Sequence, residues 1–313
     1  MYIKNYVSIR IIAKSAWKPV LIFIILSISI CALYLELGYE IVAIPFLPVG
    51  TLGTAVAILL GFRNNSAYDR FWEARKIWGG VVNYSRTFAR QITTLATLNH
   101  TQGLVDTSEL KAFHREMVYR HIAWVNALRL HLRQQDLNDP SCWWELRIFL
   151  DTDEEFMKIN NSINKPTQIL QKQAERLRDA FDKGIIEDFR HMQLDNTLSE
   201  FYNLQGMCER IKNTPLPRQY AFFTRLFTWI FMILLPFGFV MELKWKTVPL
   251  TALISWIFNT LEHVGHYTEN PFDNVINDVP MTALCRTIEI DLREQLGETK
   301  LPPKLEPVNG VLM

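Results

Sequence analysis

The sequence is poor in glycine, cysteine and net charge, and each shortage excludes a class of protein. Its 313 residues include 13 Gly and 14 Pro, too few for a collagen-like or low-complexity chain. The four cysteines lie far apart without a CxxC pair, which argues against a disulfide framework. A formal net charge of +1 does not favour a nucleic-acid surface, so we expect no nucleic-acid partner.

Catalytic signatures are also missing. There is no phosphate loop, dinucleotide fingerprint or nucleophile elbow. The most enzyme-like string is Glu262-His263-Val264-Gly265-His266, in which Glu262 and His266 share one helix face. Its order differs from that of a zinc protease and no third ligand is marked, so we interpret it as the polar end of a helix at a protein interface. We therefore expect no enzyme activity, no cofactor and no metal.

What the sequence does have is long apolar runs. Residues 19–35 and 41–62 contain no charge, and crossing a bilayer takes about 20 apolar residues. The runs 226–241 and 247–261 are shorter and also suit buried core helices, but aromatic residues near their ends favour membrane spans. A buried hairpin of a soluble protein is the alternative for the first two runs. We predict four transmembrane helices.

Lysine and arginine placement predicts the orientation of these spans. Basic residues precede the first run and follow the second, whereas the link between the two, residues 36–40, has none. Cytoplasmic loops are the ones enriched in Lys and Arg. The N-terminus, the long middle region and the C-terminus are therefore expected in the cytoplasm, although Lys244 and Lys246 in the third link favour the opposite orientation.

The middle region also reads as helical, because its apolar residues recur at helical spacing and alternating strand patterns are nearly absent. Gly184 is a candidate interruption of the segment 167–213, and Pro215 and Pro217 are expected to end that helical stretch. The sequence thus predicts an all-α chain in four parts. These are an N-terminal segment with two spans (1–62), a cytosolic helical region (63–220), two further spans (221–267) and a cytosolic C-terminal segment and tail (268–313).

The second apolar run has features of a pore-lining helix. Thr54, Ile58 and Phe62 are spaced by four and form one stripe, and small residues in the same run permit close helix approach. The polar sequence after Phe62 has no turn signal, so the helix is expected to leave the membrane unbroken. Periodicity alone leaves two interpretations open: a stripe facing lipid or the bundle, or apolar rings that gate a pore by dewetting.

Three motifs resemble the bestrophin family, in its prokaryotic form. They are LGFRNNSAYDRFWEAR from Leu60 to Arg75, CERIKNTPLP from Cys208 to Pro217 and the Asn-Pro-Phe of residues 270–272. They occur in the family's order relative to the four runs, and the resemblance covers residues 1–295.

The resemblance implies a homopentameric ion channel with one central pore in the bacterial inner membrane. The family's pore neck falls here on Thr54, Ile58 and Phe62, with Thr54 polar where an apolar ring is typical. A second, cytosolic constriction falls within residues 185–189, with Ile186 as the first choice and Ile185 as the alternative.

Animal bestrophins carry a calcium clasp just after the Asn-Pro-Phe motif. The corresponding loop here offers Asn270, Asp273 and Asp278, and only two of these are carboxylates. Calcium takes six to eight oxygen ligands and its affinity rises with their charge. The loop is therefore interpreted as vestigial, which disfavours activation by calcium.

The function expected from the sequence is a passive channel, gated by a hydrophobic neck, that conducts monovalent cations as bacterial relatives do. Its partners are further copies of itself in a pentamer, membrane lipid and permeant ions. Two alternatives remain open: an anion (chloride) channel of the same fold, and a non-conducting membrane receptor or scaffold.

Overall fold

The computed structural model describes residues 1–3, 9–99, 101, 105–134 and 140–313. In this part of the chain the secondary structure is helical, without any strand beyond isolated β-bridges near the two ends. The chain forms two compact units. We call Lys4–Phe71 with Pro215–Asn270 the apolar unit, and Met1–Ile3, Trp72–Thr214 and Pro271–Met313 the polar unit. The all-α prediction is confirmed. The division into membrane and cytosolic parts with boundaries at 62/63, 220/221 and 267/268 stays a prediction.

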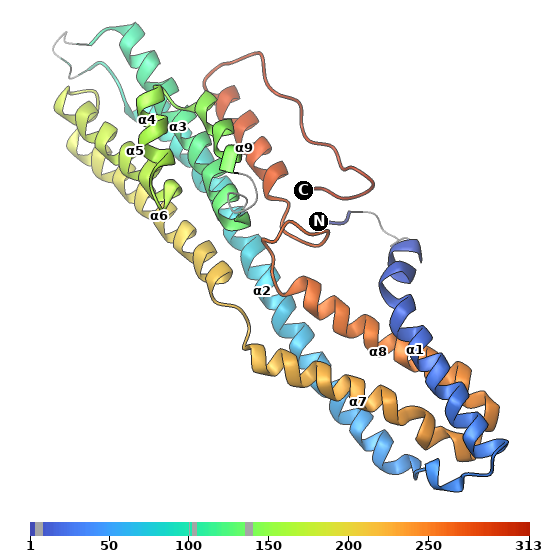
Figure 1. Ribbon diagram of the computed structural model, residues 1–313. Coiled ribbons are helices and arrows are strands. Elements are labelled where there is room, and N and C mark those ends of the chain that lie inside the picture. The colour runs from blue at the N-terminus through green and yellow to red at the C-terminus, as the bar shows by residue number, and fades with distance from the viewer. Residues whose placement is uncertain (4–8, 100, 102–104, 135–139) are drawn as a thin grey trace. The chain divides into compact units, whose positions relative to one another are not determined.

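The apolar unit contains the long apolar runs. Its elements are α1 (Ile9–Leu35), η1 (Glu40–Val42), the first part of α2 (Phe46–Leu95), α7 (Arg218–Leu243), η4 (Lys244–Lys246) and α8 (Thr247–Thr268) (Figure 1). Three stretches of the described chain are long and apolar enough to cross a membrane, namely Trp17–Leu35, Glu40–Leu95 and Arg218–Thr268. The last stretch holds both α7 and α8, so the number of four spans stays a prediction.

α2 has 50 residues and continues without a break past Arg63, as the missing turn signal predicted. Within the apolar unit it packs through an apolar core to which α1 contributes Phe23 and α7 contributes Phe231, Met232 and Leu235. At Gly53 of α2 the approach to α7 is so close that a Cβ atom would lie 2.6 Å from Phe231 Cε2. This glycine therefore lets α2 and α7 share one core.

In its described residues the polar unit contains the rest of α2 and six further elements. These are α3 (Thr107–Arg133), η3 (Pro140–Phe149), α4 (Asp153–Asn160), α5 (Lys165–Asp182), α6 (Asp188–Asn213) and α9 (Met281–Gln295). α3 packs against α5, α6, α9 and η3. Gly184, with φ of 69°, lies in the turn that separates α5 from α6, as predicted. α6 ends at Asn213 and α7 begins at Arg218, because Pro215 and Pro217 lie between them.

The first turns of α3, α4 and α5 in the polar unit have side-chain caps, which bind backbone amides that lack a partner within the helix. Asp106 accepts a hydrogen bond from Glu109 N at 2.8 Å, and Thr152 accepts one from Glu155 N at 3.1 Å. The core beneath them contains the fully buried His121, whose ring centroid lies 4.4 Å from that of Phe201. Burial lowers the pKa of His121 to about 3, so this imidazole is neutral and serves packing.

Candidate pore-lining surface

α2 presents two different faces within the apolar unit. The buried face repeats at helical spacing and consists of Val49, Gly53, Val56, Leu60, Arg63 and Ala67. Except for Arg63, these side chains are apolar or absent, so the face joins the core shared with α1 and α7. Since an α-helix turns about 100° per residue, the residues between them are forced to the opposite side.

The opposite face is exposed along its whole length in this unit. It consists of Leu47, Thr51, Thr54, Ile58, Phe62, Asn65 and Asp69, which we call the α2 stripe. Ile58 is 55% exposed and Phe62 is 64% exposed, so two large apolar side chains one helical turn apart are uncovered in the single chain. The stripe is apolar through Phe62 and becomes polar at Asn65.

Thr54 behaves as an apolar member of this stripe. Its hydroxyl donates to the Gly50 carbonyl oxygen at 3.1 Å, four residues back on the same helix. A hydroxyl bonded in this way has its proton satisfied within its own helix. Thr54, where the resemblance implies an apolar ring, therefore offers no free hydroxyl proton to the stripe.

Arg63 follows Phe62 directly but points into the unit, where its side chain is 2% exposed. Its Nη1 lies 3.2 Å from Glu262 Oε1 and its Nη2 lies 3.4 Å from Glu269 Oε2. Arg225 of α7 donates through Nε to the same Glu262 oxygen at 2.9 Å. Glu262, the first residue of the enzyme-like string, thus carries an ion network between α2, α7 and α8.

The predicted cytosolic constriction falls on buried residues. Ile185 and Ile186 are only 1% and 2% exposed, because they fill the turn between α5 and α6, where Ile185 O accepts a hydrogen bond from Thr97 N at 3.0 Å. Side chains enclosed within one chain do not suit the lining of a water-filled passage. Phe189, at the other end of the predicted range, is 82% exposed on the first turn of α6.

The loop after the Asn-Pro-Phe motif is divided between the units. Asn270 is the last residue of the apolar unit, while Asp273 and Asp278 belong to the polar unit. Asp273 Oδ1 accepts a bond from Lys212 Nζ at 2.7 Å. Asp278 is 2% exposed, and its Oδ2 accepts a bond from Val275 N at 3.2 Å. Burial raises the pKa of Asp278 to about 6.

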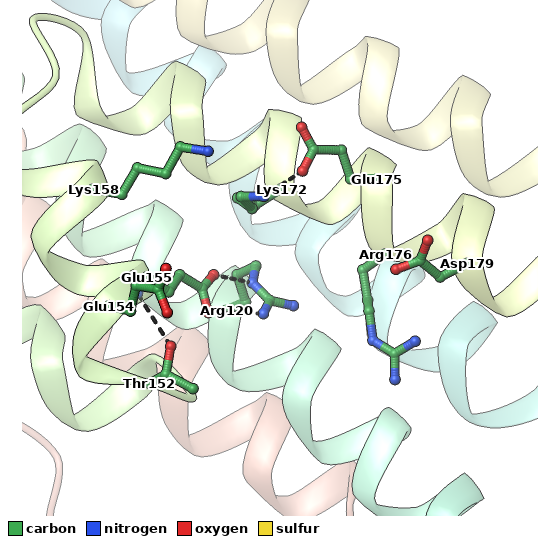
Figure 2. Close-up of a pocket in the computed structure, with 9 residues that line it drawn as sticks. All are labelled: Arg120, Thr152, Glu154, Glu155, Lys158, Lys172, Glu175, Arg176 and Asp179. Carbon is green, nitrogen blue, oxygen red and sulfur yellow. Dashed lines mark hydrogen bonds and ion pairs between the residues drawn. The ribbon is translucent and has the colours of Figure 1, made fainter.

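Among the described residues, no three His, Cys, Asp or Glu side chains are grouped as metal ligands. Figure 2 shows a pocket of about 280 Å³ in the polar unit, between α3, α4 and α5. Its buried base is Arg120, which donates from Nε and Nη2 to the two oxygens of Glu155 at 2.6 and 3.0 Å. Arg176 pairs in turn with Glu116 at 2.9 Å. These pairs join the three helices, which gives the pocket a structural role.

Sequence reasoning missed part of the stripe. Leu47, Thr51, Asn65 and Asp69 share its face but not the strict spacing of four. The true period of 3.6 residues, which alternates steps of three and four, could have identified them. Helix periodicity could not have shown that Ile186 is buried and Phe189 exposed, because that difference depends on tertiary packing.

The arrangement of long apolar helices with a separate polar helical unit defines a helical membrane protein. A family model described as the bacterial and fungal bestrophin protein matches residues 6–294. The chain is 33% identical over 299 residues to the voltage-dependent anion channel-forming protein YneE of Salmonella typhi, covering 95% of this chain and 91% of that protein. It is 34% identical over 260 residues to the voltage-dependent anion channel-forming protein mll4386 of Mesorhizobium japonicum, covering 83% and 77%.

Solved structures show the same similarity. A bacterial bestrophin homologue from Klebsiella pneumoniae superposes with a TM-score of 0.80 at 29% identity, covering 91% of this chain and 99% of that one. The chain belongs to the bacterial and fungal bestrophin family. It is therefore a member of an ion-channel family and not of an enzyme family, as the missing catalytic signatures indicated.

Proposed function

We propose that the protein is a passive ion channel whose pore is lined by the α2 stripe. The observation that carries this proposal is the exposure of large apolar side chains, Ile58 and Phe62, on a helix whose other face is fully packed. One stripe cannot enclose a passage, so several copies must share an axis. Identical head-to-tail contacts close into a ring by symmetry, and the family resemblance supports a ring of five.

The pentamer is tested by the mass of the detergent-solubilised particle. Five copies of the 36.6 kDa chain are expected after the contribution of detergent is subtracted. A conducting monomer or dimer would contradict the ring. The proposed location is the bacterial inner membrane with both termini in the cytoplasm, and α7 and α8 each cross it.

The neck of this pore is formed by rings of Thr54, Ile58 and Phe62. Water in a narrow apolar ring loses hydrogen bonds that it cannot replace, so such a ring tends to dry and to oppose ion passage. The hydroxyl of Thr54, bonded within its own helix, supports its place in this apolar series. We place the second, cytosolic ring at Phe189 instead of Ile186 or Ile185, because only Phe189 is exposed among the three.

We propose monovalent cations as the conducted ions. Within the apolar unit, Asp69 is the only charged residue on the described stripe, and it is exposed two turns beyond Phe62. Five such carboxylates around an axis would attract cations, as acidic rings do in cation channels. The positive charge of Arg63 does not oppose them, since it is buried and paired.

An anion channel is the second candidate, and the names of the relatives favour it. Both YneE and mll4386 are called voltage-dependent anion channel-forming proteins. The two signs give opposite reversal potentials under a potassium chloride gradient, so one recording separates them.

The experiment that tests the function itself is ion flux from liposomes that contain the purified protein. A passive channel releases trapped ions down their gradient without ATP. Protein that assembles in the liposomes but releases neither potassium nor chloride would favour a receptor or scaffold.

A further inference from the structure

Arg63 occupies an unusual position next to the neck. Phe62 is 64% exposed on the stripe, whereas the adjacent Arg63 is 1% exposed in the interior. Among the described residues of the apolar unit, Arg63 and Glu262 are the only charged residues that are buried. Because consecutive helix residues are about 100° apart, a contact that fixes Arg63 also fixes the direction of Phe62.

The remaining contacts of α2 constrain its rotation less. Its buried face packs through apolar groups, and hydrophobic burial has little directional preference. An ion pair, in contrast, requires specific geometry once it is removed from water, and replacing it by apolar groups often costs nothing in stability. The Arg63–Glu262 pair is therefore better explained by its effect on the orientation of α2 than by a contribution to the stability of the fold.

A second contact fixes the same register. Asn64 Nδ2 donates to the Leu261 carbonyl oxygen at 3.0 Å, one residue before Glu262. On α8, Gly265 faces Asn64 so closely that a Cβ atom would overlap the Asn64 side chain. Two consecutive residues of α2 thus meet the same turn of α8, and a rotation or a shift of α2 would break both contacts.

We propose that the buried Arg63–Glu262 ion pair is a latch that fixes the rotation of α2 against α8 and so holds Phe62 in the neck. This makes Arg63 a positioning residue, and the inference rests on the proposed pore function. Loss of the latch lets α2 rotate, so Phe62 leaves the axis more often and the apolar ring opens. Glu269 forms a second, longer ion pair with Arg63, in which Glu269 Oε2 lies 3.4 Å from Arg63 Nη2.

The test is the double variant Arg63→Gln with Glu262→Gln, which removes both charges and leaves neither one buried alone. Its open probability should rise by roughly tenfold or more, a bias of about 1.4 kcal/mol. In a Phe62→Ala background, where the ring next to Arg63 is already gone, the same double change should have a clearly smaller effect, carried by the remaining Ile58 ring alone. A purely structural role would act equally in both backgrounds, and that result would overturn the latch.

Arg225→Gln is the matched control. Both arginines donate to the same Glu262 oxygen, but Arg225 lies on α7 and its side chain is 49% exposed. Its removal should leave open probability close to that of the wild type, as should Arg63→Lys, which keeps the charge on α2. If Arg225→Gln opened the channel as strongly as the double variant, the carboxylate and not the α2 latch would be responsible.

A second readout does not depend on conduction. Phe62→Cys copies around one axis should form disulfides between subunits when oxidised, and the double variant should lower that yield, since α2 then spends less time with residue 62 directed at the axis. If the double variant lowers the disulfide yield but the wild-type protein carries no current, the latch is supported and the channel is rejected. If the wild-type protein carries current but the double variant changes neither the disulfide yield nor the open probability, the channel is supported and the latch is rejected. If the double variant fails to assemble, Glu262→Gln alone, which leaves Arg63 bonded to Glu269, must shift both readouts in the same directions.

Discussion

Gly53 of α2 lies against the ring of Phe231 of α7, where a Cβ atom would come within 2.6 Å of Phe231 Cε2 and 2.8 Å of Cζ. The contact is between a helix backbone and a buried aromatic ring, so neither partner can move aside easily. It lies on the face of α2 opposite Ile58. Packing at Gly53 thus sets how closely α2 approaches α7.

Gly53→Ala should destabilise the apolar unit, because added volume in a packed core typically costs about 1–3 kcal/mol. We expect a lower melting temperature in detergent. Gly61→Ala is the control on the same helix, since Gly61 is exposed and a Cβ atom added there would have no neighbour within 4 Å. Equal melting temperatures for the two variants would contradict the close approach of α2 to α7.

Ile58→Ala and Phe62→Ala should each raise single-channel conductance or open probability, because a wider ring stays hydrated more easily. Ile25→Ala is the matched control: Ile25 of α1 is 57% exposed, close to the 55% of Ile58. Currents like those of the wild type from both neck variants, in assembled protein, would remove these residues from the pore.

Asp69→Asn should shift the reversal potential toward that of a less cation-selective pore, since it removes the charged residue of the described stripe in the apolar unit. The neck should be unaffected, because Asp69 lies two turns beyond Phe62 on α2. The measurement is the reversal potential under a potassium chloride gradient. An unchanged value would show that selectivity is set elsewhere, and a wild-type value near the chloride potential would favour the anion channel.

Asp278 predicts a pH dependence of stability. Burial raises its pKa to about 6 from the ordinary 3.8, so the folded protein holds a proton that the unfolded chain releases. Its contribution to the free energy of unfolding is thus greatest below about pH 4 and is lost as pH rises through about 6. Asp278→Asn should raise stability at pH 8 by about 1–3 kcal/mol and change it little at pH 4. Thermal melts at both pH values check this, and a variant less stable than the wild type at pH 8 would contradict it.

The sequence was sufficient for features with local causes. The missing turn signal after Phe62 predicted the unbroken α2, and Pro215 with Pro217 predicted the end of α6. Which face of α2 is buried, in contrast, depends on α1 and α7, which lie far away in sequence. That packing leaves Thr54, Ile58 and Phe62 exposed, and the spacing of the three residues alone could not show it.

Ile186 illustrates the limit. Counting back from the proline motif led to the turn between α5 and α6, where Ile185 and Ile186 are buried. An isoleucine suits a protein core as well as a constriction, so the residue type alone could not show which of the two environments it occupies. Arg63 is a similar case. Its role as the partner of Glu262, 199 residues later, follows only from the packing of α2 against α8.

The central claim is that ions pass along the α2 stripe, and cysteine modification during recording tests it most directly. Ile58→Cys channels in a planar bilayer are exposed to a charged, membrane-impermeant thiol reagent, with Ile25→Cys as the matched exposed position on α1 and the wild type as the control for native cysteines. The account predicts that the reagent changes current through Ile58→Cys within the recording and leaves the other two unaltered. Current through Ile58→Cys that stays unchanged although mass measurement shows the thiol to be modified would contradict it.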